Sequence, residues 1–268
     1  MIKIIFIADI IGKIGRRAVQ KYLPQLKAEY RPDLVMANAE NVAHGIGFTR
    51  STLAEMQAAG VDFFTSGNHA WEKAGSNEIL NQADPMVIRP ANYPAKGKNK
   101  KAGLGFKKIT TGQIDLIVVN LMGRVFIEEK VSCPFKALAK IIVKYPNSPI
   151  IVDFHAEATS EKNALAKYFD GQVSAVIGTH THVATADEKI LPGGTACITD
   201  AGMVGYYDSV IGADKNQIFN LFLKTGQSSK KHDLPDSGEV SFDAVYLEID
   251  EKTKQAKKIK RINKLLTV

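Results

Sequence analysis

The pattern of apolar segments in this sequence predicts a layered α/β fold built around a largely parallel sheet. Short β-branched runs alternate with amphipathic stretches over the first two-thirds of the 268 residues. From residue 186 onward the pattern becomes mostly β. No internal repeat and no linker-like boundary interrupts the chain, so one domain over residues 1–268 with two sheets is the economical interpretation.

The expected elements follow from the period and length of each segment. Buried strands are expected at 3–8, 34–38, 62–66, 114–121, 150–154 and 173–178. Helices are expected between them at 15–29, 49–59, 71–82, 134–145 and 160–169. Pro134 suits a first helical position, and Thr49 and Ser160 are candidate N-caps. The β-rich part predicts strands at 187–191, 195–199, 240–249 and 256–263, a helix at 214–225 and a long loop at 226–238.

Residues 83–112 break this alternation. Pro85, Pro90 and Pro94, together with three glycines, interrupt any regular period there. We therefore predict that this segment is an irregular excursion or lid.

The composition excludes several classes of protein. The chain is 45% hydrophobic and 24% charged, which is the balance of a folded protein and excludes disorder and fibrous repeats. Its two cysteines lie far apart, which rules out a disulfide framework and favours a reducing compartment. No apolar run approaches the roughly 18–20 residues that span a bilayer, and the N-terminus lacks the pattern of a signal peptide. We therefore expect a cytoplasmic globular protein with no membrane partner.

The positive charge is concentrated in two segments. The net charge is +7, yet residues 96–108 carry six lysines and residues 252–268 carry seven lysines or arginines, with no acid in either segment. Such stripes can bind nucleic acid or anionic lipid. The alternative, a solvated loop and the outer face of an edge strand, is favoured because no aromatic residue interleaves the C-terminal lysines.

Polar side chains follow five of the expected strands. Ligands bind outside the carboxyl ends of parallel strands in an open α/β sheet, so we expect these groups at one rim. Taken singly, each has a structural alternative as a turn residue, a cap or a buried hydrogen-bonded histidine. Their repetition favours a functional site, and alternate residues of an extended His-x-His segment would face the same way. The residues are Asp9, Glu40, Asn41, Asn68, His69, His155, His180 and His182.

These residue types suit a metal centre. Nitrogen and oxygen donors without thiolate favour iron, manganese, zinc or cobalt. Eight candidate groups are too many for one tetrahedral ion and suit two ions that share a carboxylate. Asp9 and Glu40 supply only two negative charges against the four positive charges of two divalent ions, so the site would attract a phosphate or hold a hydroxide. The residues therefore predict two-metal hydrolysis of a phosphoester.

Several motifs resemble the blocks of the calcineurin-like metallophosphoesterases. The blocks are Gly67-Asn68-His69, the isolated His155 and Gly178-Thr-His180-Thr-His182, in that order. Within this superfamily the chain most resembles the YmdB-like bacterial phosphodiesterases, from residue 1 to about residue 212. The segments that carry this resemblance are 38–41, 65–69, 89–94, 120–124, 153–159 and 199–203.

The resemblance implies a four-layer α/β/β/α sandwich and a dinuclear centre. The ligands of one metal ion would be Asp9, Glu40, Asn41 and His182. The ligands of the second would be Glu40, Asn68, His155 and His180, so that Glu40 bridges the two ions. His69 would be the general acid while a metal-bridged hydroxide attacks phosphorus. The implied substrates are small phosphodiesters such as 2′,3′- or 3′,5′-cAMP.

Three positions depart from the patterns expected. Ile11 stands where the wider superfamily carries a histidine two residues after the first aspartate, and Glu40-Asn41 replaces its usual Gly-Asp pair. Both changes are typical of the YmdB-like branch. Gly205-Tyr206-Tyr207 stands where Gly-Pro-Tyr is expected, which affects the shape of the substrate rim.

The sequence leaves several alternatives open. We expect two divalent or mixed-valence metal ions, with iron favoured. Manganese and zinc stay open as alternatives because the donor set accepts all three metals. Arg124 is either a phosphate clamp or a surface arginine. The rival functions are a non-catalytic regulator that binds RNA or a protein through the lysine segments, and a single-metal hydrolase of a carbon ester or amide. A homo-oligomer is compatible with the sequence.

Overall fold

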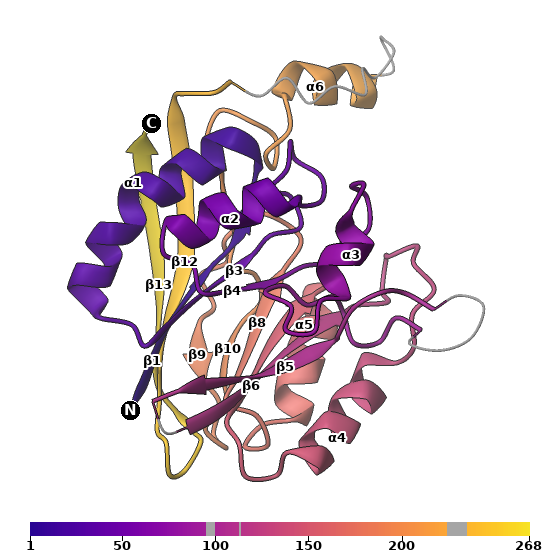
Figure 1. Cartoon of the computed structure of the whole chain (residues 1–268), viewed down its shortest axis with the longest axis vertical. Helices are drawn as coiled ribbons and strands as arrows, with labels where there is room; N and C mark the ends of the chain where they lie inside the picture. The colour runs from indigo at the N-terminus through magenta and orange to yellow at the C-terminus, as the bar shows by residue number, and fades with distance from the viewer. Residues whose placement is uncertain (95–99, 113, 224–234) are drawn as a thin grey trace.

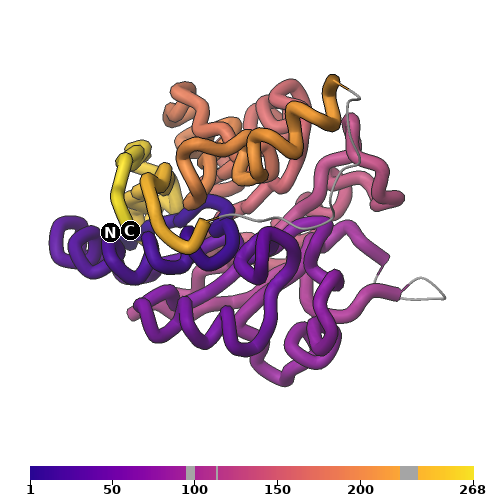
Figure 2. Tube along the Cα trace, turned by 90° about the horizontal axis from the view of Figure 1, so that it is seen from above, coloured from indigo at the N-terminus to yellow at the C-terminus, as the bar shows by residue number. Residues whose placement is uncertain are grey.

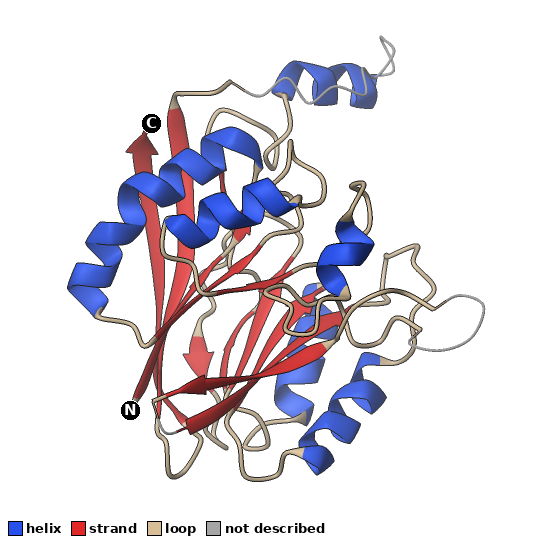
Figure 3. Ribbon diagram, viewed as in Figure 1, coloured by secondary structure: helices blue, strands red, loops and turns tan. Residues whose placement is uncertain are grey.

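Two β-sheets pack face to face in the computed structural model, with helices on both outer faces (Figures 1 and 3). The structure describes residues 1–94, 100–112, 114–223 and 235–268. The strands of the first sheet, sheet A, are β1 (Ile2–Ile7), β2 (Asp9–Ile10), β3 (Leu34–Asn38), β4 (Phe63–Thr65), β11 (Met203–Tyr206), β12 (Glu239–Ile249) and β13 (Ala256–Thr267). Those of sheet B are β5 (Phe106–Thr111), β6 (Ile114–Met122), β7 (Ile150–His155), β8 (Ala175–Thr179), β9 (Lys189–Ile190) and β10 (Ala196–Ile198). The helices are α1 (Gly12–Tyr30), α2 (Arg50–Ala58), α3 (Ser76–Leu80), α4 (Pro134–Lys144), α5 (Thr159–Tyr168) and α6 (Lys215–Leu223).

Three buried clusters separate four layers. Alternate residues of β1 point to opposite faces of sheet A, so Ile5 packs under α1 and α2 while Phe6 packs between the two sheets. The third cluster lies between sheet B and the helices α4 and α5, where Leu138 and Leu165 are fully buried. Figure 2 shows α1 and α2, in indigo and purple, together on one side of the molecule. This is the α/β/β/α sandwich that the family resemblance implies.

Each sheet mixes parallel and antiparallel strands. In sheet A, β1, β3 and β4 are parallel, but β12 runs antiparallel to β1, β11 and β13. In sheet B, β6, β7, β8 and β10 are parallel, while β5 and β9 are antiparallel edge strands. The expectation of a largely parallel sheet is therefore correct only for the centre of each sheet. That centre brings the carboxyl ends of β3, β4, β7 and β8 to one rim.

Two of the predicted helix starts are confirmed and one is wrong. Thr49 caps α2 in a reciprocal arrangement with Thr52, and Pro134 is the first residue of α4. Ser160 is not a cap, because α5 begins at Thr159 after Ala158.

The helix predicted over 71–82 is also wrong in its extent. Only α3 forms, because Gly75 adopts a left-handed conformation (φ +83°) and the chain before it runs through turns.

The irregular region and the late strands also differ in part from expectation. Residues 106–111 form β5, which pairs with β6 and packs Phe106 against Tyr145, so the irregular assignment is wrong there. A lid role for 83–112 stays a prediction. The sequence pattern missed β11, and the predicted loop at 226–238 lies mostly in residues outside those described.

The C-terminal lysine segment occupies an edge strand. β13 pairs only with β12 among the described strands, and its lysines at 257, 258, 260 and 264 are exposed. This agrees with the favoured alternative, in which lysines on an outer strand discourage pairing with other chains. Over the same described residues, no helix combines the length and the apolar character that crossing a bilayer requires.

Candidate metal centre

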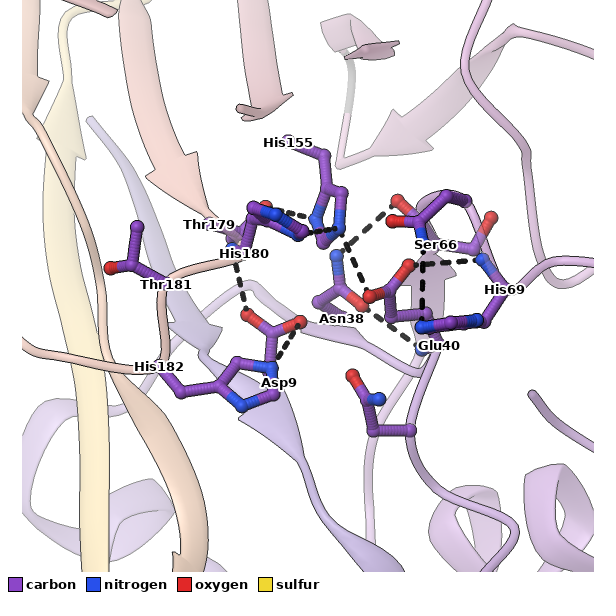
Figure 4. Close-up of polar contacts among 12 residues, drawn as sticks. Asp9, Asn38, Glu40, Ser66, His69, His155, Thr179, His180, Thr181 and His182 are labelled. Carbon is purple, nitrogen blue, oxygen red and sulfur yellow. Dashed lines mark hydrogen bonds and ion pairs between the residues drawn. The ribbon is translucent and has the colours of Figure 1, made fainter. Parts of the chain in front are cut away.

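Five strand ends bring the predicted polar residues to the seam between the two sheets. Asp9 follows the end of β1, where it begins the short strand β2, and His155 is the last residue of β7. Figure 4 shows their side chains turned toward one another. The remaining predicted residues follow β3, β4 and β8 and reach the same place: Glu40, Asn41, Asn68, His69, His180 and His182.

Glu40, His155 and His180 form one tight group. Glu40 Oε1 lies 3.0 Å from His155 Nε2, and His180 Nδ1 lies 3.0 Å from the same nitrogen. One donor atom from each residue falls within 4.8 Å of the others, close enough for a single metal ion.

Asp9, Glu40 and His182 form a second group of the same kind. Their donor atoms also lie within 4.8 Å of one another, and His182 Nε2 is 3.8 Å from Asp9 Oδ1. Glu40 belongs to both groups. The geometry therefore offers two adjacent cation positions that share one carboxylate.

Unpartnered oxygens show that the cluster fits metal ions. Asp9 Oδ1, Asn41 Oδ1 and Asn68 Oδ1 are buried and have no hydrogen-bond partner among the residues described. Burying an oxygen without a partner is costly, and such oxygens are suitable ligands for a divalent ion. Gly67 also keeps the cluster open, because a Cβ there would lie 2.0 Å from Glu40 Oε2 and 2.4 Å from His155 Nε2.

Each of the three histidines is oriented by a partner on its other ring nitrogen. His155 Nδ1 lies 2.9 Å from Thr179 Oγ1, and that hydroxyl donates to Asp153 Oδ1 at 2.6 Å. His182 Nδ1 lies 2.8 Å from the carbonyl oxygen of Ile211, which leaves its Nε2 free to face Asp9.

His180 is arranged in the opposite sense. Its Nε2 lies 3.3 Å from Glu157 Oε2, so Nδ1 faces the cluster. Partners of this kind fix the tautomer of metal-binding histidines.

The backbone of the segment His180-Thr181-His182 is not extended. His180 has φ +101° and His182 has φ +62°, both in the left-handed region. The expectation that the pair faces one site by strand alternation is therefore wrong, although both side chains reach the site. They do so because β8 ends at Thr179 and the chain turns.

A buried ion pair holds this turn. Lys162 Nζ lies 2.7 Å from Asp200 Oδ2, and both side chains are at most 2% exposed. The same oxygen accepts the Thr181 backbone N–H at 3.1 Å, and Asp200 Oδ1 accepts the Gly202 N–H at 2.9 Å. The carboxylate thus fixes the residue between the two histidines.

The electrostatics of the metal-free cluster follow from burial and close charges. Burial raises the pKa of Asp9 well above its usual range. Burial would also raise the pKa of Glu40, but the attraction of His155 outweighs it and lowers that pKa to about 2. Burial alone would lower the pKa of His155, whereas the attraction of Glu40 raises it to about 9. Burial, with the charge of His155, lowers the pKa of His180 to about 3. The metal-free site therefore holds a negatively charged Glu40 beside a positively charged His155.

His69 lies beside the cluster at the edge of a cavity. The cavity holds about 450 Å³ and is lined by Glu40, His69, His182 and the exposed apolar side chains of Val183 and Ile211. His69 Nε2 lies 3.3 Å from Asn68 Nδ2, and its backbone N–H points to Glu40 Oε2 at 3.4 Å. His69 therefore lines the cavity, where it can contact a bound molecule, and it belongs to neither group of metal-donor atoms.

Several residues that support the site were not singled out by the sequence pattern. Lys162 lies within a predicted helix, where it is an ordinary helix residue, while Thr179 and Asp200 fall inside the motifs 178–182 and 199–203 without being given a role. Asp153 and Glu157 fall inside the motif 153–159, but the pattern gave them no role. Arg124, a candidate phosphate clamp, is exposed, and its backbone N–H donates to Glu161.

Comparison with known proteins places the chain in a defined group. A family model described as "YmdB-like protein" matches residues 5–262. A 2′,3′-cyclic-nucleotide 2′-phosphodiesterase from Bacillus subtilis is 41% identical over 266 residues, which cover 97% of this chain and 96% of that protein. A crystal structure of a novel phosphatase from Mycoplasma pneumoniae has a TM-score of 0.91 and 37% identity, covering 98% of this chain and 93% of that one. The calcineurin-like phosphoesterase YfkN from Bacillus subtilis, at 12% identity, shares the fold alone (TM-score 0.55, covering 99% of this chain and 90% of that one).

Proposed function

The chain belongs to the YmdB-like family, and on this basis we propose that it hydrolyses phosphodiester bonds at a dinuclear metal centre. The observation that carries the proposal is the pair of donor groups that share Glu40, together with three buried oxygens that have no partner. The finer proposal is that the substrates are 2′,3′-cyclic nucleotides, which is the substrate class named for the Bacillus subtilis relative.

The proposed ligands divide into two sets. Asp9, Asn41 and His182 would hold one ion, and Asn68, His155 and His180 would hold the other, with Glu40 in both sets. Bound divalent ions would lower the pKa of water and offset negative charge on the phosphoryl oxygens. The set accepts iron, manganese or zinc, and we favour iron as in the sequence-based expectation.

The charge balance of the ligands favours an anionic substrate. Asp9 and Glu40 are the only carboxylates in the two proposed sets, and the other donors are neutral amides and imidazoles. Two divalent ions would leave the centre positive, which attracts a phosphodiester. The apolar side chains of Val183 and Ile211 give the rim a surface on which a nucleoside can rest.

His69 is the proposed proton donor to the departing oxygen. It lines the cavity and borders both donor groups without belonging to either. The Asn68 amide donates to His69 Nε2 only while that nitrogen carries no proton. Proton donation therefore requires the ring to turn from Asn68 or to donate through Nδ1. General-acid catalysis of this kind contributes about 10²–10⁴-fold.

The test combines metal analysis with product identification. The enzyme purified without added ions should contain two metal ions per chain and convert 2′,3′-cAMP to 3′-AMP, with 3′,5′-cAMP and bis-p-nitrophenyl phosphate as comparison substrates. His69→Ala should keep its metal and lose about 10²–10⁴-fold in turnover. His44→Asn is the matched control, because His44 is exposed at φ +57°, a conformation that asparagine tolerates.

Three results would count against the proposal. Loss of metal from His69→Ala would make that residue a ligand. One metal ion per chain with no hydrolysis of any of these diesters would favour the single-metal alternative. RNA binding that depends on salt and survives chelation would instead support the non-catalytic regulator.

A further inference from the structure

A second cavity, of about 500 Å³, lies between α4 and the segment that precedes β5. None of its lining residues lines the cavity of the metal centre. The lining includes apolar side chains and three cations, the most informative being Arg89, Leu104, Phe106, Cys133, Lys136 and Lys140. Arg89 begins the segment 89–94, which is one of those that carry the family resemblance, and it does not belong to the metal centre.

Arg89 is a buried cation without a counterion in the described part of the chain. It is 3% exposed, its Nη1 donates to the carbonyl oxygen of Pro90, and its Nε is buried without a partner. Among the residues that the structure describes, no acidic side chain acts on Arg89, because burial is the one cause of its shifted pKa. The neighbouring residues 95–99 contain no acid in the sequence.

An uncompensated buried charge is strongly destabilising, so this arrangement is incomplete without an anion. Burial lowers the pKa of Arg89, although a guanidinium keeps its proton in proteins.

The surroundings of Arg89 are uniformly positive. Lys136 and Lys140 line the same cavity, and no acidic residue lines it. Arg89 also lines a neighbouring cavity of about 370 Å³, together with Lys100 and Lys101 and again with no acid.

The start of α4 adds to this field. Among the described residues no side chain caps this helix, and its first turn contains no acid, so no carboxylate offsets the positive end of its dipole there. Cys133 and Lys136, at this end, line the cavity.

We propose that this cavity, the α4 cavity, binds a small phosphorylated molecule of about nucleotide size, with the phosphate on Arg89 and the lysines of α4. A guanidinium donates two parallel hydrogen bonds to phosphate, and the lysines add positive charge at the mouth. Leu104, Phe106 and Ile141 form an apolar wall for the body of the ligand. The volume lies within the range of small-molecule sites.

Cys133 provides a local reporter of occupancy. It lines the cavity and is partly exposed, whereas Cys197, the second cysteine, is 6% exposed. The rate at which iodoacetamide alkylates Cys133 in the metal-loaded protein, read at the peptide level by mass spectrometry, reports this cavity and not the metal centre. The probes are AMP, inorganic phosphate and adenosine.

AMP and phosphate should slow the alkylation of Cys133, and adenosine should not. The double variant Lys136→Gln/Lys140→Gln should raise the half-protecting AMP concentration about tenfold or more, since it removes two charge-assisted contacts. Lys144→Gln is the matched control, because it removes one lysine from the same helix outside the cavity lining. Arg89→Met should abolish protection, and the lysine variants decide the question if that protein does not fold.

The proposal is overturned by any of three results. These are no protection by millimolar AMP, equal protection by adenosine, or protection that the double lysine variant leaves unchanged.

Discussion

The ion pair between Lys162 and Asp200 makes a quantitative prediction for stability and for the metal centre. Lys162→Met keeps a side chain of similar length and removes the charge. Asp200 then remains buried and charged, at 1% exposure, and over the described ranges its carboxylate keeps the N–H groups of Thr181 and Gly202 as hydrogen-bond donors. Removing one member of a buried pair costs about 3–5 kcal/mol. For a domain of this size that corresponds to a fall in Tm of roughly 10 °C.

The assay is thermal and urea unfolding of the metal-free protein, followed by metal titration. Lys167→Met is the matched control, because Lys167 lies on the same helix and is exposed, and its change should stay within about 0.5 kcal/mol. Adding Asp200→Asn to Lys162→Met removes the orphaned charge, so the double variant should be more stable than Lys162→Met alone. Lys162→Met should also weaken metal binding, because Asp200 fixes the turn between two proposed ligands.

Two outcomes would refute this reasoning. A loss below about 1 kcal/mol for Lys162→Met would mean that the pair is not desolvated as the structure shows it. A double variant that is less stable than Lys162→Met would mean that the stabilising contribution comes from the charge on Asp200 itself rather than from its pairing.

Four further predictions concern the metal centre. Thr179→Val removes the hydroxyl between Asp153 and His155, so metal affinity measured by calorimetry should fall about 10–100-fold, and Thr179→Ser should restore it. Asp9→Asn should lower the metal content from two ions per chain toward one by elemental analysis, and an unchanged content would remove Asp9 from the ligands. Gly67→Ala places a Cβ inside the ligand cluster and should abolish metal binding while the circular dichroism spectrum is kept. Because the pKa of His155 is raised to about 9 by its carboxylate neighbour, a metal must displace a proton below that pH; affinity should therefore rise from pH 7 to pH 9 and then level off, with proton release detected in buffers of different ionisation enthalpy.

The candidate site could be predicted from sequence because its residues follow buried strands. Asp9, Glu40 and His155 each stand at the end of an apolar run, and parallel strands bring such ends to one rim. The supporting residues follow a different logic. Lys162 and Asp200 are 38 residues apart and meet only when α5 packs on sheet B, so no local pattern predicts their pairing, although Asp200 lies in the motif 199–203.

The errors in the predicted fold have local causes. The helix expected from residue 71 fails because Gly75 turns left-handed before α3, and apolar spacing does not detect such a turn. β5 was missed because its residues alternate between half-buried and exposed positions at a sheet edge, where prolines and glycines precede it. In both cases the periodicity of apolar residues does not determine the secondary structure, and contacts with the rest of the fold do.

The turn at His180 and His182 connects the stability of the fold with the chemistry of the site. Non-glycine residues in the left-handed region cost on the order of 1–3 kcal/mol each, and such strain persists only where the surroundings impose it. Here the surroundings are specific: Asp200 accepts the N–H of Thr181, and the carbonyl of Ile211 accepts the ring N–H of His182. If β8 continued straight beyond Thr179, His180 and His182 would lie on one face of the strand but beyond the boundary between the two sheets. The strained turn instead directs the two imidazoles into separate donor groups on either side of Glu40, which is the arrangement that two neighbouring ions require.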